Sequence, residues 1–253
     1  MKKISIVIPA LNEETGIGPV LREIPISTIK QMGYETEILV VDNGSTDRTP
    51  HIAREHGATV ILQPIRGYGN AYKAGFANAS GDIIAAGDAD LTYPFSILPF
   101  LIKKMEQEEL EFVNTDRLTD LDKSVMSISH RLGNSMLTQV IKLLFGWPFK
   151  DSQSGMWVFK REIWSKLNVQ SPGWPFSQEL KIEAYIRGFK CAEVPIAFRA
   201  RAGEVKLHAI RGAIADISHL FRKRLQVALD YKRIERSEQE NLLLEPDPAQ
   251  RAL

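Results

Sequence analysis

Short apolar runs rich in β-branched residues alternate with helical patterns along the first half of the chain. The runs that predict buried strands lie at residues 4–8, 37–41, 59–62 and 82–86. Helical periodicity follows each of them, at residues 14–32, 49–56, 69–79 and 95–108. Strands that are apolar on both sides need helices on both faces, so this pattern predicts an α/β fold with a doubly wound, mostly parallel sheet.

The second half of the chain has a less regular pattern. We expect helices at residues 125–145, 178–187 and 208–233, and a strand at residues 192–196. Residues 235–253 are polar and mildly acidic and contain two prolines, which is typical of a flexible tail. The sequence therefore predicts a single domain over residues 1–234, followed by this tail.

Polar residues gather where three of the predicted strands end. Asp88 and Asp90 follow the fourth strand, and two side chains that are two residues apart on an extended chain point the same way. Ligands of doubly wound sheets bind at the carboxyl ends of strands, so we expect one cleft there. Two carboxylates in it suit Mg²⁺ or Mn²⁺ carrying a diphosphate. The alternative is that this Asp-x-Asp caps a helix or shapes a turn.

Composition excludes several classes of protein. The 253 residues carry a net charge of +1, which gives no signature of nucleic-acid binding. Cys191 is the only cysteine, so there is no internal disulfide or multi-cysteine metal site, and a reducing cytoplasm is expected. Neither a Gly-x-Gly-x-x-Gly motif nor a P-loop occurs, which argues against nicotinamide, flavin and P-loop enzymes. No apolar run reaches the roughly 18 residues of a membrane span, so any membrane contact is expected to be peripheral.

Several motifs carry a resemblance to a known family. The segments Pro9-Ala10-Leu11-Asn12-Glu13, Val40 to Asp47, Gly67-Tyr68-Gly69 and Asp88-Ala89-Asp90 resemble, in this order, the family-2 glycosyltransferases of GT-A fold. Motifs around Arg117, 130–134, 151–155, 193–196 and 201–207 are similar to the dolichol-phosphate mannose synthase branch and its polyprenyl-phosphate relatives. The resemblance covers about residues 3–225.

The resemblance implies inverting transfer of a hexose from a nucleotide-diphospho-sugar, of GDP-mannose or UDP-glucose type, to a polyprenyl or dolichyl phosphate. It assigns Asp88 and Asp90 to a Mg²⁺ or Mn²⁺ ion and the donor diphosphate. The nucleoside would lie against Pro9, Ala10, Leu11, Asn12, Glu13, Asp42 and Gly44. The acceptor phosphate would be bound by Arg117, Arg131 and Ser135, with Arg201 and Lys206 beside the phosphates. For Asp42, a structural role in the Asn43-Gly44 turn is the alternative.

Elementary chemistry agrees with this acceptor. Arg131 and Ser135 are four residues apart and share a helix face, and a guanidinium group matches phosphate geometry. A phosphate monoester has its second pKa at about 6, so the nucleophile is already ionised at neutral pH. The protein then needs no general base and must instead neutralise negative charge.

Membrane contact has two candidate segments. The apolar stretch 136–149 either belongs to the core or guides a lipid chain at the membrane surface. Arg222-Lys223-Arg224 either attracts anionic head groups or is an ordinary solvated helix face. With the lipid acceptor, we expect a cytoplasmic protein that is peripheral on the cytoplasmic membrane face.

Two departures from the family pattern leave other functions open. Thr92 stands where the mannose-synthase branch often has Gln, and Asn43 replaces an Asp. One alternative is a family-2 enzyme acting on a hydroxyl acceptor, which needs a general base, for which Glu179 is the candidate. Another is a non-catalytic protein that binds nucleotide sugars.

Overall fold

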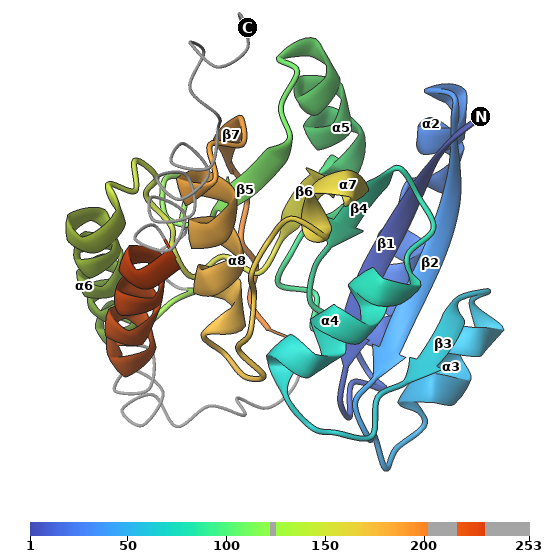
Figure 1. Ribbon diagram of the computed structural model, residues 1–253. Helices are drawn as coiled ribbons and strands as arrows, with labels where there is room; N and C mark the ends of the chain where they lie inside the picture. The colour runs from blue at the N-terminus through green and yellow to red at the C-terminus, as the bar shows by residue number, and fades with distance from the viewer. Residues whose placement is uncertain (122–124, 202–216, 231–253) are drawn as a thin grey trace, which may run out of the picture.

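A seven-stranded, mostly parallel sheet organises the chain (Figure 1). The computed structural model describes residues 1–121, 125–201 and 217–230. The strands are β1 (Lys2–Ala10), β2 (Tyr34–Asp42), β3 (Thr59–Leu62), β4 (Ile83–Ala86), β5 (Phe112–Asp116), β6 (Trp157–Lys160) and β7 (Cys191–Pro195). Their order in the sheet is β3-β2-β1-β4-β6-β5-β7, and β6 alone among them runs antiparallel to its neighbours. The predicted fold class is thereby confirmed.

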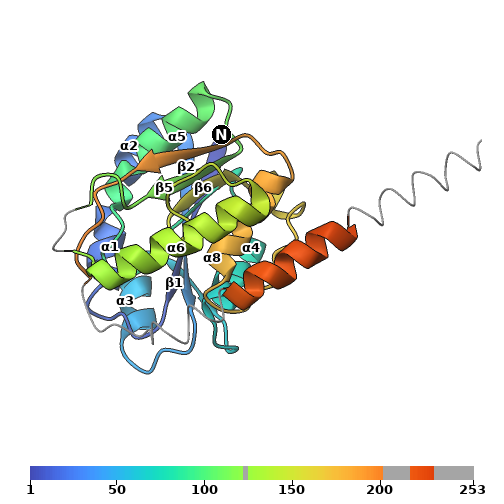
Figure 2. The ribbon, with the colours of Figure 1, turned by 90° about the vertical axis from the view of Figure 1, so that its left-hand side faces the viewer.

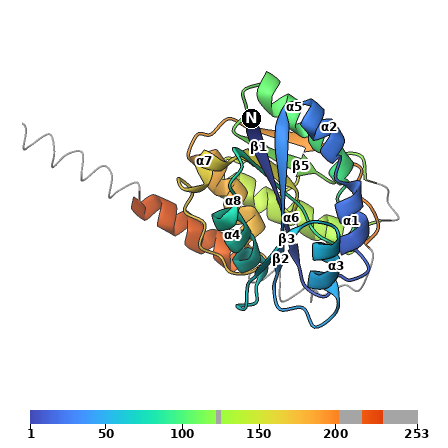
Figure 3. The same cartoon turned by 90° about the vertical axis from the view of Figure 1, so that its right-hand side faces the viewer.

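Helices cover both faces of the sheet, as Figure 3 shows with the sheet nearly edge-on. They are α1 (Ile17–Glu23), α2 (Ile26–Gln31), α3 (Thr49–Glu55), α4 (Tyr68–Asn78), α5 (Leu98–Gln107), α6 (Ile128–Phe145), α7 (Arg161–Trp164) and α8 (Phe176–Ile186), with a helical segment at 217–230 and a 3₁₀ turn, η1 (Phe95–Ile97).

Successive side chains of β1 point to opposite faces of the sheet, so they contribute to two separate parts of the hydrophobic core. Ile4, Ile6 and Ile8 pack into the core under α1, α2 and α5. Val7 points to the other face and packs under α4 and α8. All four side chains are fully buried, as expected for a central strand with helices on both sides.

The structure differs from the predicted elements at particular places. The helix predicted at 14–32 is two helices, because Ile24 is extended before Pro25, where a helix cannot easily continue. The sequence pattern does not predict strands β5 and β6, which are identified by their pairing with each other, with β4 and with β7. The start of the predicted helix 208–233 and the whole predicted tail lie outside the described residues.

Candidate active site

A cleft of about 290 Å³ lies at the carboxyl ends of β1, β2 and β4. The predicted site residues that line it are Pro9, Ala10, Leu11, Glu13, Asp88, Asp90 and Arg201. It is the place where a doubly wound sheet binds its ligand. The structure therefore brings most of the predicted donor-binding residues to one hollow.

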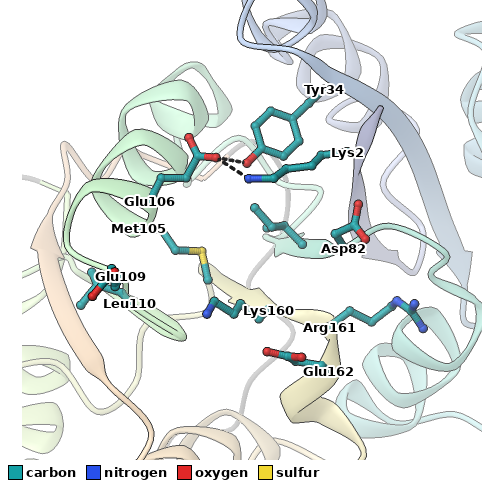
Figure 4. A pocket seen from close by; sticks show the side chains of 11 residues that line it. Lys2, Tyr34, Asp82, Met105, Glu106, Glu109, Leu110, Lys160, Arg161 and Glu162 are labelled. Atoms are coloured by element: carbon teal, nitrogen blue, oxygen red, sulfur yellow. Dashed lines mark hydrogen bonds and ion pairs between the residues drawn. The ribbon is translucent and has the colours of Figure 1, made fainter.

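A larger pocket of about 690 Å³ lies at the opposite, amino end of β1 and β4 (Figure 4). Within it, Lys2 and the Tyr34 hydroxyl both donate to the Glu106 carboxylate. It contains none of the predicted site residues. The smaller cleft is therefore the candidate active site.

Asp88 lies just beyond β4 and is held by two tyrosines of α4. The hydroxyls of Tyr68 and Tyr72 donate to its Oδ1 at 3.3 and 3.0 Å. Burial raises the pKa of Asp88 to about 7, and the neighbouring Asp90 adds to this effect. The cleft thus contains more negative charge than its own groups neutralise.

Asp90 is oriented from both sides. Its Oδ1 accepts hydrogen bonds from the backbone N–H and the hydroxyl of Thr92, at 3.1 and 2.5 Å. Its Oδ2 forms an ion pair with Arg201 at 2.8 Å, and the Asp90 side chain is only 4% exposed. Thr92, a departure from the family pattern, therefore fixes the rotamer of one of the two carboxylates.

The two carboxylates fit a hard divalent cation. No group of three or more His, Cys, Asp or Glu side chains suitable for a metal occurs in the described ranges. Mg²⁺ and Mn²⁺ do not need one, since in nucleotide sites they take one or two carboxylates and complete their shell with phosphate oxygens and water. A cation at this place would favour the ionised form of Asp88, whose pKa is raised mainly by burial and then by the charge of Asp90.

The two loops assigned to the nucleoside, at residues 9–13 and 42–47, are joined by hydrogen bonds. Asn12 has a left-handed backbone (φ 51°), and its Oδ1 accepts a hydrogen bond from the Thr46 N–H at 2.8 Å. Asp42 accepts from the Ser45 N–H at 2.9 Å, and Gly44 takes the positive φ of 88° that this turn requires. Asn12, Asp42 and Gly44 thus shape the loops, whereas Pro9 to Leu11 and Glu13 line the cleft.

Asn43 has a role that the sequence did not indicate. Its Nδ2 donates to the carbonyl oxygens of Gln63 and Ile65, at 2.9 and 3.0 Å, and its Oδ1 accepts from the Gly67 N–H at 2.8 Å. The amide therefore fastens the loop 63–67 beside the cleft. A carboxylate lacks the two donated hydrogen bonds.

An aromatic wall closes one side of the cleft. The rings of Tyr68 and Trp174 stack with centroids 4.5 Å apart, and both line the hollow. Gly67 and Gly69 allow this, because a Cβ on either would lie 2.3 Å from a carbonyl oxygen of Pro172 or Ser171. Sequence reasoning missed Trp174 and Tyr72, although the four-residue spacing of Tyr68 and Tyr72 was a usable signal.

Arg117 is engaged by Asp151. Its Nε and one terminal nitrogen donate to the two Asp151 oxygens at 2.7 and 2.9 Å. Burial alone would raise the pKa of Asp151, but Arg117 holds it well below its usual range. Asn134 of α6 donates to the same carboxylate at 3.1 Å. This buried group therefore joins the end of β5 to α6.

Arg131 and Ser135 do not line the cleft. Arg131 is half-buried and Ser135 is exposed, one turn apart on α6. Lys206 lies outside the described residues. The structure thus gives the predicted acceptor residues two different settings, a buried ion pair for Arg117 and an outer helix surface for Arg131 and Ser135.

Glu179, the candidate base of the hydroxyl-acceptor alternative, is buried and does not line the cleft. Its Oε2 accepts from the backbone N–H groups of Gln170 and Ser171, at 3.0 and 2.7 Å. Its Oε1 accepts from Lys223 Nζ at 3.0 Å. Both oxygens thus have structural partners.

A family model matches more than half of this chain. The model of glycosyl transferase family 2 matches residues 5–167, which include both loops, the Asp88–Asp90 pair and the aromatic residues of α4. The chain belongs to glycosyl transferase family 2. Among the described residues, no helix is both long and apolar enough to cross a membrane.

Two relatives from Haloferax volcanii illustrate the breadth of this family. The low-salt glycan biosynthesis hexosyltransferase Agl6 is 36% identical over 208 residues, which are 81% of this chain but 50% of that protein. This chain thus spans about half the length of Agl6. A dolichyl-phosphate hexose transferase is 35% identical over 213 residues, 84% of this chain and 90% of that protein.

A solved structure with a similar fold is glucosyl-3-phosphoglycerate synthase from Mycobacterium tuberculosis. Its complex with Mn²⁺, UDP and glucosyl-3-phosphoglycerate has a TM-score of 0.67 and 27% sequence identity, and the match covers 88% of this chain and 80% of that one.

Proposed function

We propose that this family-2 enzyme transfers a hexose, with inversion, from a nucleotide-diphospho-sugar to a polyprenyl phosphate. The observation that carries the proposal is the cleft in which Asp88, Asp90 and Arg201 face the loop 9–13. The relatedness to a dolichyl-phosphate hexose transferase over 84% of the chain supports the acceptor class. The donor is of GDP-mannose or UDP-glucose type.

Asp88 and Asp90 would hold Mg²⁺ or Mn²⁺. The ion would supply positive charge to the diphosphate that leaves. Arg201 contacts Asp90 and lines the same cleft, so it would lie beside the departing phosphates. Pro9, Ala10, Leu11 and Glu13 would contact the nucleoside, while Asn12, Asp42 and Gly44 keep their loops in shape.

In the proposed step an oxygen of the acceptor phosphate attacks the anomeric carbon. The bond from that carbon to the diphosphate oxygen breaks, and the nucleoside diphosphate leaves with the bonding electrons. The attacking oxygen is already ionised, so no base is required. Arg131 and Ser135 would bind the acceptor phosphate from α6, with Lys206 beside it. Arg117 would contribute charge while it stays paired with Asp151.

A polyprenyl phosphate acceptor would require the enzyme to work at a membrane surface. A polyprenyl phosphate keeps its chain in the bilayer, so the protein would work peripherally on the cytoplasmic face.

The test is transfer from labelled GDP-mannose and UDP-glucose to a short polyprenyl phosphate, with Mn²⁺ or Mg²⁺. We expect an acid-labile lipid-linked sugar from one of these donors. Asp90→Ala should abolish it while the variant still unfolds cooperatively, whereas the exposed Asp120→Ala should remain active. Absence of product with every donor would contradict the proposal.

The hydroxyl-acceptor alternative is separated by two variants. Arg131→Ala should lower transfer to the polyprenyl phosphate, because a guanidinium contact to phosphate is lost. Glu179→Gln should act mainly on stability, since both Glu179 oxygens have structural partners. If activity per folded molecule disappears in Glu179→Gln and survives in Arg131→Ala, a hydroxyl acceptor is the better assignment.

A further inference from the structure

The helix at 217–230 exposes a continuous apolar stripe. Ile217, Phe221, Leu225 and Leu229 follow one another at four-residue intervals and are 39%, 58%, 62% and 57% exposed. Leu220, outside the stripe on the inner side of the helix, is fully buried. A helix that turns one apolar side to the core and a second apolar side outward needs a partner for the outer side.

Helix α6 repeats this arrangement. Its exposed apolar residues are Ile128, Leu132, Met136 and Leu143, which are between 61% and 86% exposed. On its buried side, Leu137 and Ile141 belong to the same hydrophobic cluster as Leu220 of the helix 217–230 and Ile182 of α8. The two helices lie side by side on one flank of the molecule (Figures 1 and 2). We call the eight exposed residues of the two stripes the docking face.

The charges next to the docking face are almost all positive. Arg222 and Arg224 are exposed on the two sides of the stripe of helix 217–230. Helix α6 contributes Arg131 and Lys142 and contains no Asp or Glu. Asp230, at the end of the other helix, is the single acid in these two segments. Such a face is complementary to an anionic surface and would repel a second copy of itself.

Lys223 explains why the stripe faces outward. Its ammonium group is buried and contacts Glu179 Oε1 at 3.0 Å and Glu183 Oε1 at 2.7 Å on α8. The helix is thereby fixed to α8 through this side, and the stripe is left on the other. Of the run Arg222-Lys223-Arg224, only the two arginines are available to a partner.

We propose that the docking face binds the surface of an anionic lipid bilayer. The two stripes would enter the boundary between head groups and acyl chains, and Arg222 and Arg224 would contact lipid phosphates. Arg131 and Ser135 lie on α6 next to Leu132 and Met136, so this mode of docking brings them to the lipid surface. The inference rests on the exposed stripes and their charges, and it stands independently of the proposed sugar transfer.

The test is co-sedimentation of the full chain with vesicles, without donor or acceptor. Vesicles of phosphatidylcholine and phosphatidylglycerol should bind the protein, and vesicles of phosphatidylcholine alone should bind it more weakly. The double variant Phe221→Ser/Leu225→Ser should weaken binding by about tenfold or more, because two exposed apolar side chains that docking would bury are lost. Arg222→Gln/Arg224→Gln should cost about fivefold per arginine and reduce the salt dependence.

Phe100→Ser is the matched control, since Phe100 on α5 is 56% exposed and lies outside the docking face. It should bind as the unmodified protein does, and melting temperatures verify that every variant folds. Failure of the unmodified protein to bind anionic vesicles would overturn the inference, as would equal binding by Phe221→Ser/Leu225→Ser and Phe100→Ser. It would also be overturned if the stripe substitutions dissociated a dimer in gel filtration and left vesicle binding unchanged.

Because no sugar nucleotide or polyprenyl phosphate is present, the vesicle result does not depend on the proposed reaction. Transfer without vesicle binding would remove this inference alone. Vesicle binding without transfer would leave the docking face and remove the proposed function.

Discussion

Asn43 fastens the loop at residues 63–67 to the end of β2 through three hydrogen bonds. The side chain is 5% exposed, so water cannot replace a lost partner. The replacement of a carboxylate by an amide at this position is thus compensated by its surroundings. The amide at this position therefore does not favour the alternative of a non-catalytic protein that binds nucleotide sugars.

Replacing Asn43 by the aspartate of the family pattern should destabilise the folded protein. Asn43→Asp places a carboxylate oxygen against the carbonyls of Gln63 and Ile65, so we expect the free energy of unfolding to fall by roughly 2 to 4 kcal/mol. Urea denaturation measures the change. Asn78→Asp is the control, because Asn78 is exposed on α4 and should lose less than about 1 kcal/mol. Equal costs at the two positions would contradict the fastening role of Asn43.

Gly155 sets the space around Asp88. A Cβ at this position would lie 2.7 Å from Tyr68 Oη and 3.1 Å from Asp88 Oδ2. The sequence offered this glycine as part of a family motif, and only the folded chain reveals that it adjoins the carboxylate.

We expect Gly155→Ala to weaken donor binding by about tenfold, because the added methyl group displaces Tyr68 or Asp88 and misplaces the oxygen ligands. Titration calorimetry with UDP or GDP and Mn²⁺ measures the affinity. Gly133→Ala, whose Cβ meets nothing within 4 Å, should bind normally. An unchanged affinity in Gly155→Ala would show that this contact is unimportant.

At the scale of elements, Glu37 connects β2 to β1 and to the chain entering β4. Its carboxylate accepts from the Ser5 hydroxyl at 2.5 Å, the Ser80 N–H at 2.9 Å and Lys3 Nζ at 3.0 Å. Burial by itself would raise its pKa, but these hydrogen bonds lower the pKa to about 2. These contacts at the end of the sheet far from the cleft thus depend on one ionised group.

The folded protein should therefore lose stability in acid through Glu37. In the unfolded chain a glutamate has a pKa of about 4.3, so the contribution is complete above that pH and is lost as the pH falls toward about 2. Its size is about 3 kcal/mol, since each unit of the pKa difference corresponds to about 1.4 kcal/mol. Urea unfolding at several pH values should give a smaller decrease for Glu37→Gln than for the unmodified protein. The exposed Glu35→Gln, on the same strand, should retain the full decrease.

Across the whole molecule, the cleft combines residues from both halves of the chain. Asp88 and Asp90 follow β4, whereas Trp174 precedes α8 and Arg201 follows β7. A ligand in this cleft contacts both parts, so its binding energy should stabilise the entire fold by mass action.

A donor nucleotide with Mn²⁺ should accordingly raise the melting temperature. At a hundredfold excess over its dissociation constant, the ligand adds about 2.7 kcal/mol, which corresponds to roughly 5 to 10 °C for a chain of this size. Thermal shift assays with UDP and GDP measure it. Chelation of the metal with EDTA and the Asp90→Ala variant should each remove the shift, and Asp120→Ala should keep it. A shift that persists in EDTA would exclude the metal from donor binding.

The sequence by itself determined the doubly wound sheet, the ends of β1, β2 and β4, and the gathering of Asp88 and Asp90 with the loop 9–13. These features follow from local patterns, because β-branched runs define strands and the ends of parallel strands meet at one edge. Only the tertiary structure decided which charged groups pair. Arg117 binds Asp151, 34 residues away, and Glu179 binds Lys223, 44 residues away. Spacing along a chain carries no information about such distant partners, whose burial and approach depend on how the completed elements pack.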